Sequence, residues 1–287
     1  METRRYPLGI QTFSEIVKGN YYYADKTDVV YRLAHYAKFH FLSRPRRFGK
    51  SLFISTLQAY FEGKKDLFKG LAIEKLEKEW VEYPVLHFDI SQSKYFDVAT
   101  LKMSINALLI PYEKQYGLKT DKEESNSNRL TYIIQEAVRQ TGKQVVILID
   151  EYDAPMHDTM GKDELQTNIR NIMRDFFSPL KKQEGNLRFV LITGISKFSQ
   201  LSIFSELNNL KNISMKDEYS DICGITKEQL ITDFQEGIKK MAEHNDLSID
   251  ETIKLLKEHY DGYHFSPNCP DIFNPYSIIN ALDDKDF

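Results

Sequence analysis

The stretch that decides the fold runs from Phe39 to Ser51 and reads FHFLSRPRRFGKS. The run Lys38–Ser43 is mainly apolar and aromatic, which is typical of a short buried strand. The basic residues that follow interrupt it, and a helical pattern then extends over Lys50–Phe61. The residues therefore predict a strand, a basic loop and a helix in direct succession, with Gly-Lys-Ser at the start of the helix.

The run Gly49-Lys50-Ser51 matches the second half of the phosphate-binding pattern G-x-x-x-x-G-K-[ST], the Walker A motif. In such a loop the helix N-terminus faces the phosphates, Lys50 reaches the β and γ oxygens and Ser51 holds Mg²⁺. Arg44 stands where the first glycine belongs, and Pro45 restricts φ, so we expect a stiffer loop with a different entry. Gly-Lys-Ser also occurs at helix starts that bind no ligand. The predicted nucleotide contacts in this region are Arg46, Arg47, Phe48, Gly49, Lys50, Ser51 and Leu52.

An acidic strand end supplies the partner that this loop needs. The run Gln144–Asp150 is apolar up to its last residue, and Glu151 follows directly. Ligands bind at the C-terminal ends of the strands in open α/β sheets. In a Walker B arrangement, Asp150 holds Mg²⁺, usually through water, and Glu151 polarises the water that attacks the γ-phosphate. Two acids at a strand end can also serve only as a turn or helix cap, and Asp153 is either a supporting acid or a loop residue.

Strand and helix patterns alternate through the first two thirds of the chain. Further buried strands are predicted at Pro84–Ser91 and Leu187–Ile195, and helices near Ala99–Gln115, Leu130–Gln140 and Leu165–Lys182. This alternation indicates an α/β fold with a mainly parallel central sheet and helices on both faces.

After about Ile213 helical patterns dominate, at Thr226–His244 and Ile249–Tyr260, and a loop is predicted over Asp261–Pro275. The first of these helices begins with TKEQ, a capping-box signature. We therefore predict a P-loop core over residues 1–214 and a helical lid over residues 215–287. The second part includes the start of a winged-helix-like element that the end of the chain truncates.

Composition limits the classes of protein. Of the 287 residues, 41% are hydrophobic and 13% aromatic, which is enough for a substantial core and excludes wholesale disorder. No apolar run is long enough for a membrane span and the N-terminus lacks a signal peptide, so we expect a cytoplasmic protein without a membrane partner. The formal charge is −4, but the acid-free stretch Val29–Phe61 carries six basic residues, which indicates a local anion site.

Together the motifs resemble a family of bacterial AAA-ATPase-like proteins, whose N-terminal domain is often followed by a nuclease domain of the restriction-endonuclease-like PD-(D/E)XK type. The form RPRRFGKS is this family's own version of the loop. The resemblance implies a P-loop core with strand order 5-1-4-3-2, a helical lid, and ATP and Mg²⁺ as cofactors. It spans nearly the whole chain and rests on Tyr6–Ile10 with Phe13, Tyr21–Thr27, Arg44–Ser51, Ile149–Asp153, Thr193–Ser199 and Tyr260–Tyr263.

The resemblance also implies roles for residues outside the loop. The N-terminal tyrosine segment packs near the base, where the ring of Tyr22 or Tyr23 stacks on it, and Tyr23 is our candidate. A tyrosine cluster of this kind is equally typical of an apolar core. In nucleotide hydrolases of the AAA+/STAND group a polar residue after the fourth strand senses the γ-phosphate. Here that residue is Thr193 or Ser196, with Lys197 as an additional cation, and ordinary turn chemistry is the alternative.

The lid departs from the AAA+ pattern because no arginine occurs after Arg188. An arginine finger would have to come from another copy of the chain, through Arg170, Arg174 or another arginine of the core, and the first two lie one helical turn apart. The same spacing suits an ordinary surface stripe. The arginine finger and the surface stripe both stay open as interpretations. A homo-oligomer, which the finger requires, stays open as well.

We therefore expect a Mg²⁺-dependent ATPase that acts as a nucleotide-driven switch for an attached nuclease-like domain or another protein partner. The nuclease domain itself has no room within 287 residues. The alternatives are a nucleotide-binding scaffold without turnover, a small-molecule kinase, and an effector that contacts nucleic-acid phosphates through the loop arginines. The predicted catalytic residues are Glu151, Lys50 and Thr193, and the predicted Mg²⁺ ligands are Ser51 and Asp150.

Overall fold

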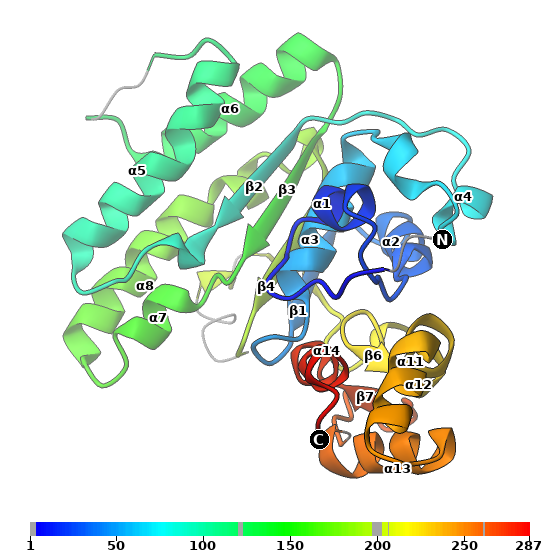
Figure 1. Ribbon diagram of the computed structural model, residues 1–287. Coiled ribbons are helices and arrows are strands. Elements are labelled where there is room, and N and C mark those ends of the chain that lie inside the picture. Colours follow the sequence, from blue (N-terminus) through cyan, green and yellow to red (C-terminus); the bar gives the residue numbers. More distant parts are fainter. Residues whose placement is uncertain (1–3, 120–122, 197–202, 206, 261) are drawn as a thin grey trace.

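A computed structural model describes residues 4–119, 123–196, 203–205, 207–260 and 262–287 of the chain. Its centre is a sheet of five parallel strands in the order β2-β3-β4-β1-β5 (Figure 1). Counted from the opposite edge this is the order 5-1-4-3-2, so the predicted α/β fold and strand order are confirmed. The strands are β1 (Phe39–Ser43), β2 (Val85–Asp89), β3 (Val145–Asp150), β4 (Leu187–Gly194) and β5 (Lys211–Asn212).

Helices cover both faces of the sheet, because the central strands carry apolar side chains on both faces. Phe41 and Ile147 belong to the apolar cluster on one face, and Leu42 and Leu148 to the cluster on the other. None of the described helices has the length and apolar character that crossing a bilayer requires. The first face is covered by α5 (Val98–Gln115), α6 (Asn126–Thr141), α7 (Ala154–Asp158), α8 (Asp163–Phe177) and α9 (Pro179–Lys182), and the second by α1 (Phe13–Lys18), α2 (Thr27–Ala34), α3 (Lys50–Phe61) and α4 (Ile73–Leu76).

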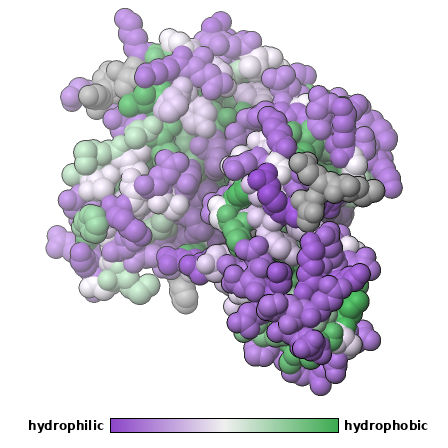
Figure 2. All heavy atoms as spheres, in the orientation of Figure 1, coloured by the Kyte–Doolittle hydropathy of each residue, from purple (hydrophilic) through white to green (hydrophobic). Residues whose placement is uncertain are grey.

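The residues after β5 form a smaller group of helices around an apolar cluster of their own. The predicted capping box is present, since Thr226 and Gln229 each accept a hydrogen bond from the other's main-chain N–H. In Figure 2 this group projects as a lobe from the larger body, and its visible surface is largely hydrophilic. Its elements are β6 (Ile225–Thr226), α11 (Lys227–Asp233), α12 (Gln235–His244), α13 (Ile249–Tyr260), β7 (Ile272–Phe273) and α14 (Pro275–Asp284), with β6 and β7 antiparallel.

The N-terminal segment packs against this C-terminal group. The ring of Tyr22 is stacked between Tyr6 and Phe234, with centroid distances of 5.1 Å and 5.3 Å. Gly237 in α12 permits the approach, because a Cβ at that position would lie 2.1 Å from the hydroxyl oxygen of Tyr6. The described N-terminal segment therefore packs against one face of the sheet through Phe13 and against the C-terminal helices through Tyr6 and Tyr22, and the division between residues 214 and 215 stays a prediction.

Three predicted elements differ from the structure. The helix expected over Leu165–Lys182 is interrupted before Pro179, because proline lacks the N–H that would continue the helical hydrogen bonds. The helix expected over Thr226–His244 divides at Phe234, whose ring is buried in the C-terminal cluster. The loop expected over Asp261–Pro275 contains β7. Strands of two residues, such as β5 and β7, show no periodicity that a sequence pattern could reveal.

His40 makes the stability of the sheet depend on pH. Its side chain is fully buried in β1, and its ring packs against Phe189 with a centroid distance of 4.9 Å. Burial lowers the pKa of His40 to about 4, from an ordinary value of 6.5. Between these values the unfolded chain binds a proton that the folded chain does not, so the free energy of unfolding falls as the pH drops from 6.5 toward 4.

We expect His40 to account for about 3 kcal/mol of this acid destabilisation, from the difference in pKa. Urea unfolding at several pH values between 7 and 4 measures it. The variant His40→Leu should show a flatter dependence, whereas a leucine at the exposed His244 should leave the wild-type slope. An identical slope in wild type and His40→Leu would contradict the assignment.

Candidate functional site

The basic loop between β1 and α3 has two residues with left-handed backbone angles. Arg47 has φ of 64° and Gly49 has φ of 91°. Gly49 forms the N-cap of α3, and this conformation favours glycine because a Cβ would strain it. The chain therefore enters the helix through a tight turn, and the N-terminal N–H groups of α3 are left for an external acceptor.

Lys50 is buried, and three acceptors surround its ammonium group. Its Nζ donates to the main-chain oxygens of Arg44 at 3.1 Å and Pro45 at 3.2 Å, and it forms an ion pair with Oε1 of Glu151 at 3.0 Å. The loop and the end of β3, about 100 residues apart in the sequence, thus meet at the predicted lysine and the predicted glutamate.

Glu151 turns toward the loop because its backbone leaves the strand in a left-handed conformation, with φ of 51°. A residue other than glycine at such an angle is strained, and strain of this kind is concentrated at functional sites. Burial raises the pKa of the Glu151 carboxyl, and the ammonium of Lys50 opposes this effect. The carboxylate is therefore placed to accept a proton beside a cation.

Asp150 and Thr193 lie behind this ion pair, at the ends of β3 and β4. Both are buried, and the Thr193 hydroxyl donates to Oδ1 of Asp150 at 2.5 Å. The main-chain N–H of Glu151 donates to the same hydroxyl oxygen at 3.4 Å. In the structure Thr193 therefore orients the two acids, and its hydroxyl does not face the cavity described below.

Asp153 organises the turn after β4. Its buried carboxylate accepts hydrogen bonds from the main-chain N–H of Ile195 and from both the N–H and the hydroxyl of Ser196. His157 contacts the same carboxylate at 3.0 Å. Asp153 is therefore a supporting acid, and the Ser196 hydroxyl is engaged by it. Lys197 lies outside the described residues.

A cavity of about 230 Å³ lies in front of the loop. Most of the predicted phosphate contacts line it, and two neighbouring walls come from elsewhere in the chain. One wall is the N-terminal segment from Pro7 to Gln11, and the other is the start of α14. There the centroid of the Tyr276 ring lies 4.3 Å from the guanidinium carbon of Arg47. The predicted residues that line the cavity are Arg46, Arg47, Gly49, Lys50, Ser51, Leu52 and Glu151.

A second, mainly apolar cavity of about 80 Å³ adjoins the first, and Gly49 and Leu52 line both. Tyr23 lines this second cavity, and so does Phe48, whose buried ring does not reach the first one. Tyr22 also borders it, but its ring is already stacked with the rings of Tyr6 and Phe234. Of the two candidate tyrosines, Tyr22 therefore already has two stacking partners, and Tyr23 remains the candidate.

Sequence reasoning missed the walls that α14 and the N-terminal segment contribute. The run Asn274-Pro275 signals a helix start, and Asn274 does cap α14, but nothing local indicates that this helix faces the loop. Arg170 and Arg174, the proposed finger residues, line neither cavity.

The donors available for a metal are oxygen atoms. Among the described residues, no group of three or more His, Cys, Asp or Glu side chains could hold a metal ion by itself. Ser51 is the second residue of α3, next to Lys50, and Asp150 precedes Glu151 at the end of β3. One hydroxyl and one carboxylate fit a Mg²⁺ ion that takes its other ligands from substrate phosphates and water.

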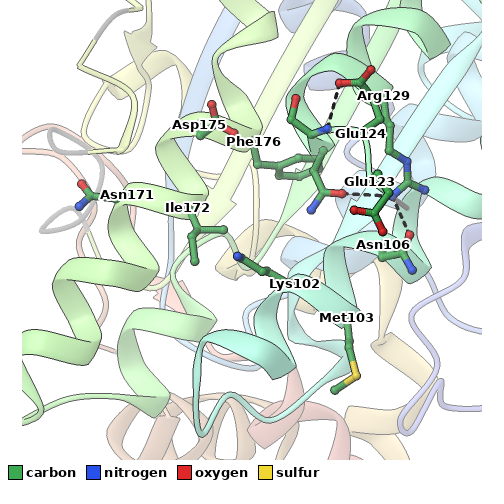
Figure 3. A pocket seen from close by; sticks show the side chains of 12 residues that line it. Lys102, Met103, Asn106, Glu123, Glu124, Arg129, Asn171, Ile172, Asp175 and Phe176 are labelled. Carbon is green, nitrogen blue, oxygen red and sulfur yellow. Dashed lines mark hydrogen bonds between the residues drawn. The ribbon is translucent and has the colours of Figure 1, made fainter. Parts of the chain in front are cut away.

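Another cavity, of about 650 Å³, lies between α5, α6 and α8 (Figure 3). Arg129 at its floor is paired with Glu113 through two hydrogen bonds of 2.6 Å and 2.9 Å, so its charge is neutralised. Acidic side chains also line this cavity, including Glu124 and Asp175. Its chemistry is not that of a phosphate site.

Comparisons with known proteins show the family to which the chain belongs. A family model described as "Predicted AAA-ATPase" matches residues 7–204. An uncharacterized protein in the vnfD 5' region of Azotobacter chroococcum mcd 1 is 35% identical over 288 aligned residues, which cover all of this chain and 53% of the relative. The chain thus spans about half the length of that curated relative.

The Thr193 contact makes a prediction about stability. In Thr193→Val the side-chain volume is kept, but Oδ1 of the buried Asp150 loses its donor, and we expect the free energy of unfolding to fall by about 1–3 kcal/mol. Urea titration measures the change. The matched variant Thr167→Val removes an exposed hydroxyl that bonds only within α8, and its effect should stay below about 0.5 kcal/mol. Equal effects in the two variants would show that the Thr193 contact contributes nothing special.

Proposed function

Because the chain belongs to the predicted AAA-ATPase family, whose members are nucleotide-binding proteins, we propose that it binds ATP together with Mg²⁺ and hydrolyses the bond between the β and γ phosphates. The observation that carries the proposal is the contact between Lys50 and Glu151 at the mouth of the 230 Å³ cavity. This contact places a cation that can bind the phosphates beside a carboxylate that can accept a proton from water.

The phosphates are assigned to the cavity in front of α3. The N-terminal N–H groups of this helix, the Lys50 ammonium and the exposed guanidinium groups of Arg46 and Arg47 supply the positive charge. These arginines line the nucleotide cavity itself, which disfavours the alternative in which they serve nucleic acid.

The base is assigned to the adjoining apolar cavity. Tyr23 and Phe48 provide aromatic lining, and Lys26 is the only charged side chain among the residues that line it. The Lys26 ammonium donates to the side-chain oxygen of Gln229 at 2.6 Å, so it is held at the wall. A flat heteroaromatic ring suits a small apolar cavity with few polar groups.

Hydrolysis requires one proton acceptor and stabilisation of the transferred phosphoryl group. Glu151 takes the proton of the water whose oxygen attacks the γ-phosphorus, the bond to the β-bridging oxygen breaks, and ADP and phosphate leave. Ser51 and, through water, Asp150 would hold Mg²⁺, which would supply positive charge against the phosphates. Thr193 acts by orienting Asp150 and the main chain of Glu151.

The switch function is a further part of the proposal. Tyr276 of α14 contacts Arg47 of the loop, so a nucleotide that engages Arg47 changes the contacts of a C-terminal helix. The relative is almost twice as long as this chain, which is compatible with a following nuclease-like domain or a partner that receives the signal. A finger from Arg170 or Arg174 of another copy stays a prediction.

Two variants test the hydrolase. In Glu151→Gln, ATP should still bind, because Lys50 and the loop are unchanged, but turnover should fall by about 100-fold to 10,000-fold. In Lys50→Ala, binding itself should be lost. ATP affinity and phosphate release are measured for both variants, with Lys181→Ala as an exposed lysine control.

Equal background turnover in wild type and Glu151→Gln would defeat the hydrolase proposal. Tight ATP binding without turnover in the wild type would then favour the scaffold alternative.

A further inference from the structure

Arg44 occupies the place of the first glycine in the phosphate-binding pattern, and its side chain is directed away from the cavity. We propose that Arg44 is a positioning residue that holds Lys50 in place and joins the phosphate loop to the C-terminal segment, by which we mean the chain that follows β5, from residue 213 onward. The proposal rests on the ATP binding proposed above, and it adds a route by which occupancy of the loop reaches that segment.

The guanidinium of Arg44 is 1% exposed and is enclosed by main-chain carbonyl groups. Nη1 donates to the oxygens of Ser43 at 3.0 Å and Ser214 at 2.6 Å. Nη2 donates to the oxygens of Tyr219 at 3.0 Å and Ser220 at 3.3 Å. Three of these four acceptors belong to the chain that follows β5, so the side chain fixes the start of the C-terminal segment.

An aromatic turn near the C-terminus completes this enclosure. The guanidinium carbon of Arg44 lies 4.0 Å from the centroid of the Phe265 ring. Phe48, four residues further along the loop, contacts Phe265 and Tyr263 edge-on at 5.2 Å and 4.7 Å. Two residues of the loop, Arg44 and Phe48, therefore contact the ring of Phe265, and Phe48 also contacts Tyr263.

The main chain of Arg44 connects this arrangement to the phosphate site. Its carbonyl oxygen accepts from the ammonium of Lys50, and its N–H donates to the oxygen of Gly194 at the end of β4. A phosphate that draws Lys50 away from that oxygen alters the loop entry. Because the side chain of the same residue holds the Ser214–Ser220 segment and Phe265, the change is transmitted to both.

Lysine cannot replace arginine here. Arg44 belongs to no ion pair among the described residues; its guanidinium donates to carbonyl oxygens and lies over the face of a ring. A planar guanidinium reaches four carbonyls while its face stays against Phe265. An ammonium has three donors and no flat face, so Arg44→Lys keeps the charge and loses the geometry.

The experiment compares wild type with Arg44→Lys, Phe265→Leu and the control Arg188→Lys. Arg188 makes the same kinds of contact, donating to the carbonyl of Ala34 and lying over the ring of Tyr83, but it stands at the N-terminal end of β4, whereas Arg44 follows the C-terminal end of β1. ATP dissociation constants are measured for all four proteins. Hydrogen exchange is followed with and without ATP at residues 49–53, 214–222 and 263–265.

We expect the dissociation constant for ATP to rise about tenfold or more in Arg44→Lys and about threefold in Phe265→Leu, with no change in Arg188→Lys. ATP should slow exchange in all three segments of the wild type. In Arg44→Lys the slowing should disappear at residues 214–222 and 263–265 while some persists at residues 49–53. Phe265→Leu leaves Arg44 intact, so it tests the link even where Arg44→Lys folds poorly.

Wild-type ATP affinity in both variants, or ATP-dependent slowing at residues 263–265 that survives in both, would overturn the proposal. Hydrogen exchange measured without ATP tests the structural link independently of the proposed ATP binding. Faster exchange at residues 49–53 and 214–222 in Arg44→Lys supports the link by itself. If the wild type then fails to bind ATP, the proposed function is wrong while the structural link between loop and C-terminal segment stands.

Discussion

The ion pair between Lys50 and Glu151 is the contact on which the site depends. Both groups are largely withdrawn from water, so each needs the other to offset its desolvation. Their meeting requires β1 and β3 to flank β4, which is the strand order of this sheet. It also requires Glu151 to leave β3 in a left-handed conformation, since a continued strand would carry its side chain to the other face. Topology and one strained residue together produce the site.

The rest of the chain encloses that contact. Pro7 to Gln11 and the start of α14, at opposite ends of the sequence, form walls of the same cavity. The two walls are connected because the ring of Tyr22 stacks with the rings of Tyr6 and Phe234. These contacts make the N-terminal segment part of the C-terminal apolar cluster. The basic loop is thus covered by two segments that are distant in the sequence and are connected through these ring contacts.

Local sequence patterns are sufficient to predict the elements that form the candidate site. Buried strands, Gly-Lys-Ser and the acid pair depend on short-range periodicity and on the rule that parallel strands present their C-terminal ends at one edge. What the sequence could not reveal depends on distant contacts. Nothing adjacent to Tyr22 shows that two rings cover it, nothing near Asn274 shows that α14 faces the loop, and two-residue strands such as β5 have no pattern at all. The loss of the first glycine was visible, but its reason lies in carbonyl groups about 170 residues further along.

That substitution changes how the loop is stabilised. A glycine at the entry of a phosphate loop leaves its conformation to the loop itself, because glycine contributes no side-chain contacts. Arg44 instead anchors the entry to carbonyls after β5 and to the ring of Phe265, and Pro45 restricts φ beside it. The shape of the loop then depends on residues beyond 213, including α14, which forms a wall of the cavity. A loop built in this way is not self-contained, because the C-terminal segment both holds its entry through Arg44 and forms a wall of the cavity in front of it.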